Sequence, residues 1–101
     1  MTKIKICGMR RVDDILYVNT YHPDYAGFIL SEGFTRTVDI DTFYDLELLL
    51  NKGIKRVGVF VNEPIEKILK SFAQKLDVIQ LHGEENAEYI DKLRENCDCE
   101  I

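Results

Sequence analysis

Apolar and polar positions follow two different rhythms along this chain. Four short runs are rich in apolar and β-branched residues, and they predict strands at residues 4–7, 25–30, 56–61 and 77–82. Between these runs, apolar residues recur at helical spacing and predict helices over 11–22, 39–53, 62–76 and 84–97. The closing segment CDCEI, at 97–101, reads as the beginning of a fifth strand.

Residues at the ends of the predicted helices support these boundaries. Asp39 is expected to cap the second helix, and Gly53 is expected to end it. Asn62 stands near the cap of the third helix, and Pro64 lies in its first turn, where a missing N–H costs little. Acidic residues are expected in the first turns of the first and fourth helices, where they favour the helix dipole: Asp13, Asp14, Glu84 and Glu85.

Each predicted helix carries an apolar stripe that should face a core. The stripes are Val12, Ile15, Leu16 and Val18; Ile40, Phe43, Leu46, Leu49 and Leu50; Ile65, Ile68, Leu69, Phe72 and Leu76; and Ala87, Tyr89, Ile90 and Leu93. Strand and helix alternating four times predict an α/β fold with parallel strands and right-handed crossovers. The equal offsets from Lys3 to Lys55 and from Tyr25 to Asp77 suggest a repeated βαβα unit, although the two copies share little identity.

Composition narrows the class of protein. The 101 residues predict one domain, and 46% hydrophobic with 31% charged residues is typical of a soluble globular protein. A net charge of −5 argues against a nucleic acid or an anionic membrane as partner. No apolar run approaches the roughly 20 residues of a membrane span, and the first residues lack a signal-peptide core, so a cytoplasmic location is expected. The three cysteines, Cys7, Cys97 and Cys99, predict neither a disulfide framework nor a zinc site.

Several polar residues come directly after the predicted strands. The loop over 31–38 is the longest strand-to-helix connection and contains Gly33 and Arg36. Ligands of parallel α/β proteins bind at the carboxyl ends of the strands. The residues expected to gather on that rim are Cys7, Gly8, Arg36, Asn62, Gln80 and His82. Each also has a structural interpretation: Cys7 as a small buried residue, Arg36 as a solvated loop residue, Asn62 as a helix cap, and His82 as a hydrogen-bonding group.

Five motifs in order resemble one known family. The motifs are KICGMR at 5–10, AGFIL at 26–30, the following loop that ends S…TRTV, RVGVFVNE at 56–63 and VIQLHGEE at 78–85. Together they resemble phosphoribosylanthranilate isomerase, a (β/α)8 barrel of tryptophan biosynthesis. The resemblance runs along essentially the whole chain. A complete (β/α)8 barrel takes roughly 200 residues or more, whereas this chain holds about four βα units. Residues 1–101 therefore resemble the N-terminal half of such a barrel.

The resemblance implies an Amadori rearrangement of N-(5-phosphoribosyl)anthranilate, with no cofactor and no metal. Cys7 resembles the general base of the family, and Arg36 resembles the residue that holds the anthranilate carboxylate. The general acid, an aspartate, and the main phosphate-binding loops would belong to a C-terminal half. Gln80 and His82 share one face of the fourth strand and are expected near the substrate or Cys7.

The first strand presents two distinct faces. Lys5 and Cys7 are expected on the inner face of the barrel, where the lysine would increase the thiolate fraction of Cys7, while Ile4 and Ile6 pack on helices. Gly8 lets the backbone turn sharply beside the sulfur. An open half barrel would also expose apolar lining, expected to include Phe28 or Ile29, Phe60 and Val78.

The chain alone is therefore expected to be inactive, and to self-associate or bind a C-terminal half. Two other hypotheses stay open. One is a non-catalytic half barrel that serves as a folding or association module. The other is a thiol-redox module built on Cys97 and Cys99, which their terminal position and C-x-C spacing disfavour.

Overall fold

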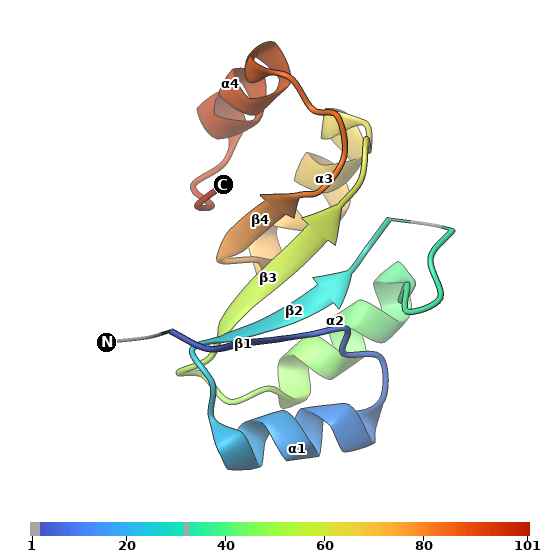
Figure 1. The fold of residues 1–101 in the computed structure, drawn as a ribbon, viewed down its shortest axis with the longest axis vertical. Coiled ribbons are helices and arrows are strands. Elements are labelled where there is room, and N and C mark those ends of the chain that lie inside the picture. The colour runs from blue at the N-terminus through green and yellow to red at the C-terminus, as the bar shows by residue number, and fades with distance from the viewer. Residues whose placement is uncertain (1–2, 32) are drawn as a thin grey trace.

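The computed structural model describes residues 3–31 and 33–101, in which strands and helices alternate as the sequence pattern predicts (Figure 1). The elements are β1 (Lys5–Cys7), α1 (Val12–Tyr21), β2 (Tyr25–Ile29), α2 (Ile40–Leu49), β3 (Lys55–Phe60), α3 (Ile65–Ser71), the 3-10 turn η1 (Ala73–Lys75), β4 (Val78–Leu81) and α4 (Ala87–Asn96). The four strands form one parallel sheet in the order β1-β2-β3-β4. The predicted α/β half-barrel architecture is thus confirmed.

The outer face of the sheet packs against the helices and forms the hydrophobic core. Phe28 of β2 and Phe60 of β3 are fully buried there. Phe43 of α2 contacts Phe28 with ring centroids 5.0 Å apart, and Phe72 contacts Phe60 at 5.6 Å. The expectation that Phe60 lines the inner face is therefore wrong, and of the expected alternatives Phe28 or Ile29 it is not Phe28 that lines it. Strand residues alternate between the two faces, so Ile29, next to Phe28, takes the inner position.

Among the described residues no helix covers the inner face, yet part of it is sheltered. Val57 is only 2% exposed and Val59 only 8%. Lys5 of β1 reaches across the curved face and donates a hydrogen bond from Nζ to Oε1 of Gln80 on β4. This contact between the two edge strands shelters the valines of β3 that lie between them. The exposed apolar surface of the inner face is therefore smaller than expected for an uncovered half barrel.

Several local predictions need correction. The side chain of Asp39 accepts a hydrogen bond from Thr42 N at 2.8 Å, which confirms the predicted cap, but α2 ends at Leu49 rather than near Gly53. Asn62 does not cap α3, because its backbone is left-handed (φ 50°) and the helix starts after Pro64. The third helix is also shorter than predicted, since α3 ends at Ser71 and the separate 3-10 turn η1 follows Phe72.

Three large residues of the predicted helix stripes are about half exposed, namely Val12 (51%), Leu16 (57%) and Leu49 (51%), and Ala87 is exposed as well. Helices α1, α2 and α4 therefore contact the core through narrower faces than their stripes suggest, and α1 buries only Ile15 and Val18 completely. The stripe of α3 has no exposed member. Ile6 packs against the core as predicted, whereas Ile4 is 59% exposed. Ile4 precedes the edge strand β1, where no helix of the described chain covers it.

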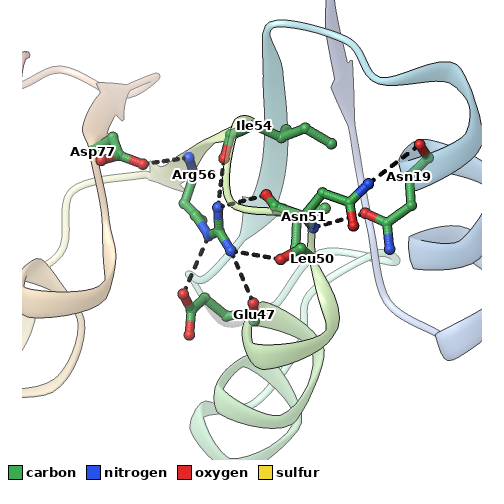
Figure 2. A network of polar contacts seen from close by, with 7 residues as sticks. All are labelled: Asn19, Glu47, Leu50, Asn51, Ile54, Arg56 and Asp77. Carbon is green, nitrogen blue, oxygen red and sulfur yellow. Dashed lines mark hydrogen bonds and ion pairs between the residues drawn. The ribbon is translucent and has the colours of Figure 1, made fainter.

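Arg56 organises the amino end of the sheet (Figure 2). Its guanidinium donates to the Glu47 carboxylate at 3.2 Å and to four backbone carbonyls, at 2.6 to 3.2 Å. Those carbonyls belong to Glu47, Leu50, Asn51 and Ile54. Arginine has five N–H donors, so every one has a partner here. The side chain thereby binds the carboxyl end of α2 and the loop after it, where Glu47 O and Asn51 O also accept backbone N–H groups from Leu50 and Ile54.

Two aspartates make the same kind of hydrogen bond at the amino end of the sheet. Asp24 accepts a hydrogen bond from Ile4 N at 2.8 Å, and Asp77 accepts one from Arg56 N at 2.8 Å. Each carboxylate thus binds the backbone of the preceding strand. Their common placement agrees with the repeated βαβα unit suggested by the offsets. Beyond α4, Glu100 forms an isolated parallel bridge with Val78, at the place predicted for a fifth strand.

Candidate active site at the carboxyl ends of the strands

Cys7 is the last residue of β1, and its side chain is exposed on the inner face. It pairs with Gly27 of β2. A Cβ added at Gly27 would lie only 2.9 Å from Cys7 Sγ, so the missing side chain leaves the space that the thiol occupies. The interpretation of Cys7 as a small buried residue is wrong. The thiol is accessible at the rim.

Gly8 brings the rim loops close to this thiol. Its φ of +88° suits glycine, and its N–H donates to Gly27 O at 2.9 Å. A Cβ at Gly8 would lie 3.0 Å from Cδ and 3.1 Å from Nη1 of Arg36. Arg36 therefore packs directly over Gly8, the residue that follows Cys7. The structure places Arg36 against a residue 28 positions earlier in the sequence.

The long loop after β2 is anchored while its arginine stays available. Thr37 Oγ1 donates to Ser31 O at 2.6 Å, and Arg10 Nη1 donates to Thr35 O at 3.3 Å. The Arg36 side chain is exposed, and within residues 3–31 and 33–101 its guanidinium makes no hydrogen bond or ion pair. A planar guanidinium without partners suits bidentate binding of a carboxylate.

A small hollow of about 210 Å³ opens beside the thiol. It is lined by Cys7, Ile29, Phe34, Val59, Val61, Gln80 and His82. Most of its wall is apolar, which suits an aromatic or other flat apolar group. Of the predicted site residues, the hollow unites Cys7, Gln80 and His82, while Arg36 stands at Gly8 next to it.

Lys5 lies on the same face as Cys7, one step toward the amino end. Its ammonium binds Gln80 and lines a second hollow, of about 320 Å³, that reaches Tyr25 and Val78. The predicted effect of Lys5 on the Cys7 thiolate stays a prediction. What the structure adds is a direct contact between two of the predicted site residues.

Glu85 has a role that the sequence did not indicate. It was expected in the first turn of a helix, but α4 begins at Ala87, after an Asn86 cap. Its carboxylate instead accepts hydrogen bonds from Asn62 N at 2.8 Å and Gly83 N at 2.9 Å. This clamp joins the ends of β3 and β4. The available signal was the occurrence of Asn62 and Gly83 directly after neighbouring strands.

Ser31 and Phe34 were also missed. Ser31 is 2% exposed, and its hydroxyl accepts a hydrogen bond from Val61 N at 2.8 Å, which ties the ends of β2 and β3 together. Phe34 lines the hollow beside Cys7 and is 48% exposed. A phenylalanine in a loop carries no pattern that would show this, because its position depends on the fold of the loop.

The other two thiols are structural in their contacts. Cys97 Sγ donates to Leu93 O at 3.3 Å, and the single S–H of Cys99 is shared between Ala73 O at 3.4 Å and Leu76 O at 3.3 Å. Burial raises the pKa of Cys99 to about 11, with a further contribution from Cys97. A protonated thiol is a poor nucleophile. Within the described ranges, no group of three or more His, Cys, Asp or Glu side chains could hold a metal ion.

The chain has close relatives of known name. The family N-(5'-phosphoribosyl)anthranilate (PRA) isomerase matches residues 4–101. The N-(5'-phosphoribosyl)anthranilate isomerase of Clostridium acetobutylicum is 54% identical over 95 residues, which cover 93% of this chain and 46% of that protein. The isomerase of Caldanaerobacter subterraneus subsp. tengcongensis is 50% identical over 95 residues, with the same coverage.

Solved structures agree with this relationship. The phosphoribosylanthranilate isomerase of Thermotoga maritima has a TM-score of 0.88 and 35% identity, and the match covers 96% of this chain and 48% of that one. A phosphoribosylanthranilate isomerase in complex with reduced 1-(o-carboxyphenylamino)-1-deoxyribulose 5-phosphate also has a TM-score of 0.88, over 50% of its chain. The present chain thus spans about half the length of its relatives.

Parallel βα units with reactive side chains on the carboxyl rim define the (β/α)8-barrel class of enzymes. The specific motifs and the matches over residues 4–101 go further. This chain belongs to the N-(5'-phosphoribosyl)anthranilate isomerase family. Within the described part of the chain, no helix is both long and apolar enough to cross a membrane.

Proposed function

We propose that this chain supplies the general-base half of a phosphoribosylanthranilate isomerase of tryptophan biosynthesis. The observation that carries the proposal is the exposed Cys7 thiol, with Arg36 packed over the adjacent Gly8, at the rim of a family member. The reaction converts N-(5-phosphoribosyl)anthranilate into 1-(o-carboxyphenylamino)-1-deoxyribulose 5-phosphate. An acid protonates the ribose ring oxygen, and the ring opens to an imine. A base then removes the proton from C2, and the resulting enol becomes the ketone.

Each rim residue receives one role in this reaction. The Cys7 thiolate takes the C2 proton, because sulfur stands at the strand end with open space before it. Arg36 holds the anthranilate carboxylate through its free planar fork. Gln80 and His82 line the hollow with Cys7 and contact the bound substrate, and Lys5 orients Gln80. The rim requires no metal or cofactor for these steps, because the imine itself accepts the electrons.

The general acid and the phosphate-binding loops come from a C-terminal half. The four strands leave β1 as an open edge and β4 as an edge that is paired only through Glu100, whereas a barrel of this type closes with eight strands. The relatives are about twice as long as this chain. A C-terminal half or a second copy of this chain would cover both edges and complete the inner face. The intact enzyme would act in the cytoplasm on a small phosphosugar substrate.

A non-catalytic half barrel is the second candidate function. The observation that favours it is the shelter of Val57 and Val59 beneath the Lys5–Gln80 contact, which lets the chain stay folded alone. Such a chain would fold and associate without turning over substrate.

The test combines this chain with the C-terminal half of the Clostridium acetobutylicum relative and measures isomerisation. Cys7→Ser should lower kcat by about 10²-fold or more, because serine is a far weaker base at neutral pH. The control is the Cys97→Ser/Cys99→Ser double variant, which should keep near-normal turnover. Arg36→Lys keeps the charge but loses the fork, so it should mainly raise KM.

Near-normal turnover of Cys7→Ser would exclude Cys7 as the base. An unchanged KM for Arg36→Lys would remove Arg36 from the substrate site. Isomerisation by the chain without any added half would show that a carboxylate of residues 1–101 serves as the acid. Association without turnover would favour the non-catalytic candidate.

A further inference from the structure

Cys97 and Cys99 lie on the wall of one hollow at the amino end of the sheet. The hollow has a volume of about 460 Å³, and its other walls come from α3, η1 and the turn before β4. Both thiols are free and half-buried. Of the residues that line the hollow beside Cys7, none lines this one. The two thiols are therefore a feature that the chemistry of the rim does not use.

The backbone holds the two residues in place from both sides. Cys97 directly follows α4. Glu100, the residue after Cys99, is paired with the sheet. Its N–H donates to Asp77 O at 3.1 Å, and its carbonyl accepts from Ile79 N at 2.7 Å. Residues two positions apart have Cα atoms within roughly 7 Å of each other, which is a separation that a disulfide can span.

The two sulfurs also influence one another. Burial is the main cause that raises the pKa of Cys99 to about 11, and the Cys97 thiol is the next cause, ahead of the carboxylates of Asp77 and Asp98. An ionisable group has such an effect at short range, within about 4–6 Å. At neutral pH Cys99 is therefore protonated, and Cys97 is the thiol of the pair from which a reaction can start.

We propose that Cys97 and Cys99 are a modification site, a thiol pair that a small-molecule disulfide converts into an intrachain disulfide. The Cys97 thiolate attacks one sulfur of the small disulfide, so that a mixed disulfide forms at Cys97 and one small thiol leaves. Cys99 then gives its proton to solvent and attacks the Cys97 sulfur, and the second small thiol leaves. The protein loses two protons and two electrons, and the small disulfide becomes two thiols.

The geometry favours the intrachain bond over a lasting mixed disulfide. Two reacting groups held in one hollow meet far more often than two molecules in solution do. The bond should also persist, because burial gives the Cys99 thiolate no stabilisation and so lowers the gain from reduction. Redox catalysts differ in this respect, since their stabilised thiolates make their disulfides easy to reduce. The inference is independent of the proposed function.

The test treats the native 101-residue chain with glutathione disulfide, alkylates the remaining thiols in denaturant, and weighs the tryptic peptides by mass spectrometry. Cleavage after Arg94 yields peptide 95–101 with both thiols, and cleavage after Lys5 and Arg10 yields peptide 6–10 with Cys7. Peptide 95–101 should lose two hydrogens and carry neither glutathione nor an alkyl group. Peptide 6–10 is the internal control and should carry glutathione, because Cys7 is exposed and the other two cysteines lie at the opposite end of the sheet.

Two matched variants identify the order of attack. Cys99→Ser leaves Cys97 alone and should trap its mixed disulfide with glutathione. Cys97→Ser should form a mixed disulfide at Cys99 at least tenfold more slowly, because burial holds that thiol protonated. Circular dichroism of both variants verifies that the fold is kept. Equal rates in the two variants would overturn the assignment of Cys97 as the first nucleophile.

Two results for the parent chain would overturn the thiol pair itself. One is a peptide 95–101 that carries two alkyl groups or two glutathione molecules after the treatment, because the sulfurs would then react separately or not at all. The other is a disulfide-linked dimer on a non-reducing gel that disappears in Cys97→Ser, because Cys97 would then react with a second copy of the chain rather than with Cys99.

Discussion

The two ends of the same sheet treat their polar side chains in opposite ways. At the amino end, Arg56 makes five side-chain hydrogen bonds, and the carboxylates of Asp24 and Asp77 each hold a backbone N–H. At the carboxyl end, Cys7 is exposed and the Arg36 guanidinium has no partner in the described chain. Two arginines of one small domain thus differ completely in their surroundings.

This difference separates stability from chemistry. A buried polar group that has all its partners stabilises the fold, and removing it leaves those partners unsatisfied. An exposed group without partners adds little to the fold, but it remains available to a ligand. The carboxyl end is also where barrel enzymes place their active sites, whereas the amino end serves stability. The contrast between Arg56 and Arg36 can therefore be tested directly.

Replacement of Arg56 by methionine should have the largest effect on stability. The change removes five hydrogen bonds, and of the four carbonyls only those of Glu47 and Asn51 keep a backbone N–H donor, so the free energy of unfolding should fall by about 3 kcal/mol. Urea denaturation followed by circular dichroism measures it. The matched control is Arg36→Met, which should change the same free energy by less than about 0.5 kcal/mol. An equal loss of unfolding free energy in the two variants would contradict the conclusion that the amino end, and not the carboxyl end, stabilises the fold.

The thiol at the amino end should make stability sensitive to alkaline pH. Burial raises the pKa of Cys99 from 9.0 to about 11, so the native chain holds this proton more tightly than the unfolded chain does. The contribution of this proton to the free energy of unfolding is complete below pH 9 and is lost as the pH rises from 9 to 11. Unfolding free energies across that range should fall less steeply in Cys99→Ala than in the parent. A parallel fall in both proteins would show that Cys99 does not cause the effect.

Substitutions at the open rim should have the smallest effect on stability. Cys7→Ala and His82→Ala each remove an exposed side chain, so the unfolding free energy should change by less than about 0.5 kcal/mol. The same urea titrations measure the change. A loss above about 1 kcal/mol in either variant would mean that the rim also carries the fold, and the comparison between the two ends would weaken.

The sequence predicted the order of elements and the rim because both depend on local patterns. Strand runs and helical spacing were readable, and residues after parallel strands must share one edge. It was harder to predict which strand residues face the core and which face the inside of the barrel. The run YAGFIL is apolar on both faces, so nothing in it distinguishes Phe28 from Ile29, and only packing against Phe43 decides.

Long-range polar contacts were the hardest feature to predict. Glu85 resembled a helix-start acid, yet its partners are Asn62 on the previous unit and Gly83. Arg56 appeared only as the first residue of an apolar run, and its five acceptors come from the end of the preceding helix and the loop after it. Such roles depend on which backbone groups the finished fold leaves unpaired, and this is not a local property of the sequence.

The glycine behind the rim thiol has an evolutionary consequence. A side chain at Gly27 would meet Cys7 Sγ at 2.9 Å, so positions 7 and 27 cannot drift independently. A lineage that keeps the cysteine can acquire a side chain at position 27 only if the sulfur moves away. Loss of the cysteine to alanine would remove the shortest contact, but the Cβ and Cα of residue 7 would still lie 3.3 and 3.4 Å from the new Cβ. The space at position 27 is therefore limited by the sulfur and by the neighbouring strand itself.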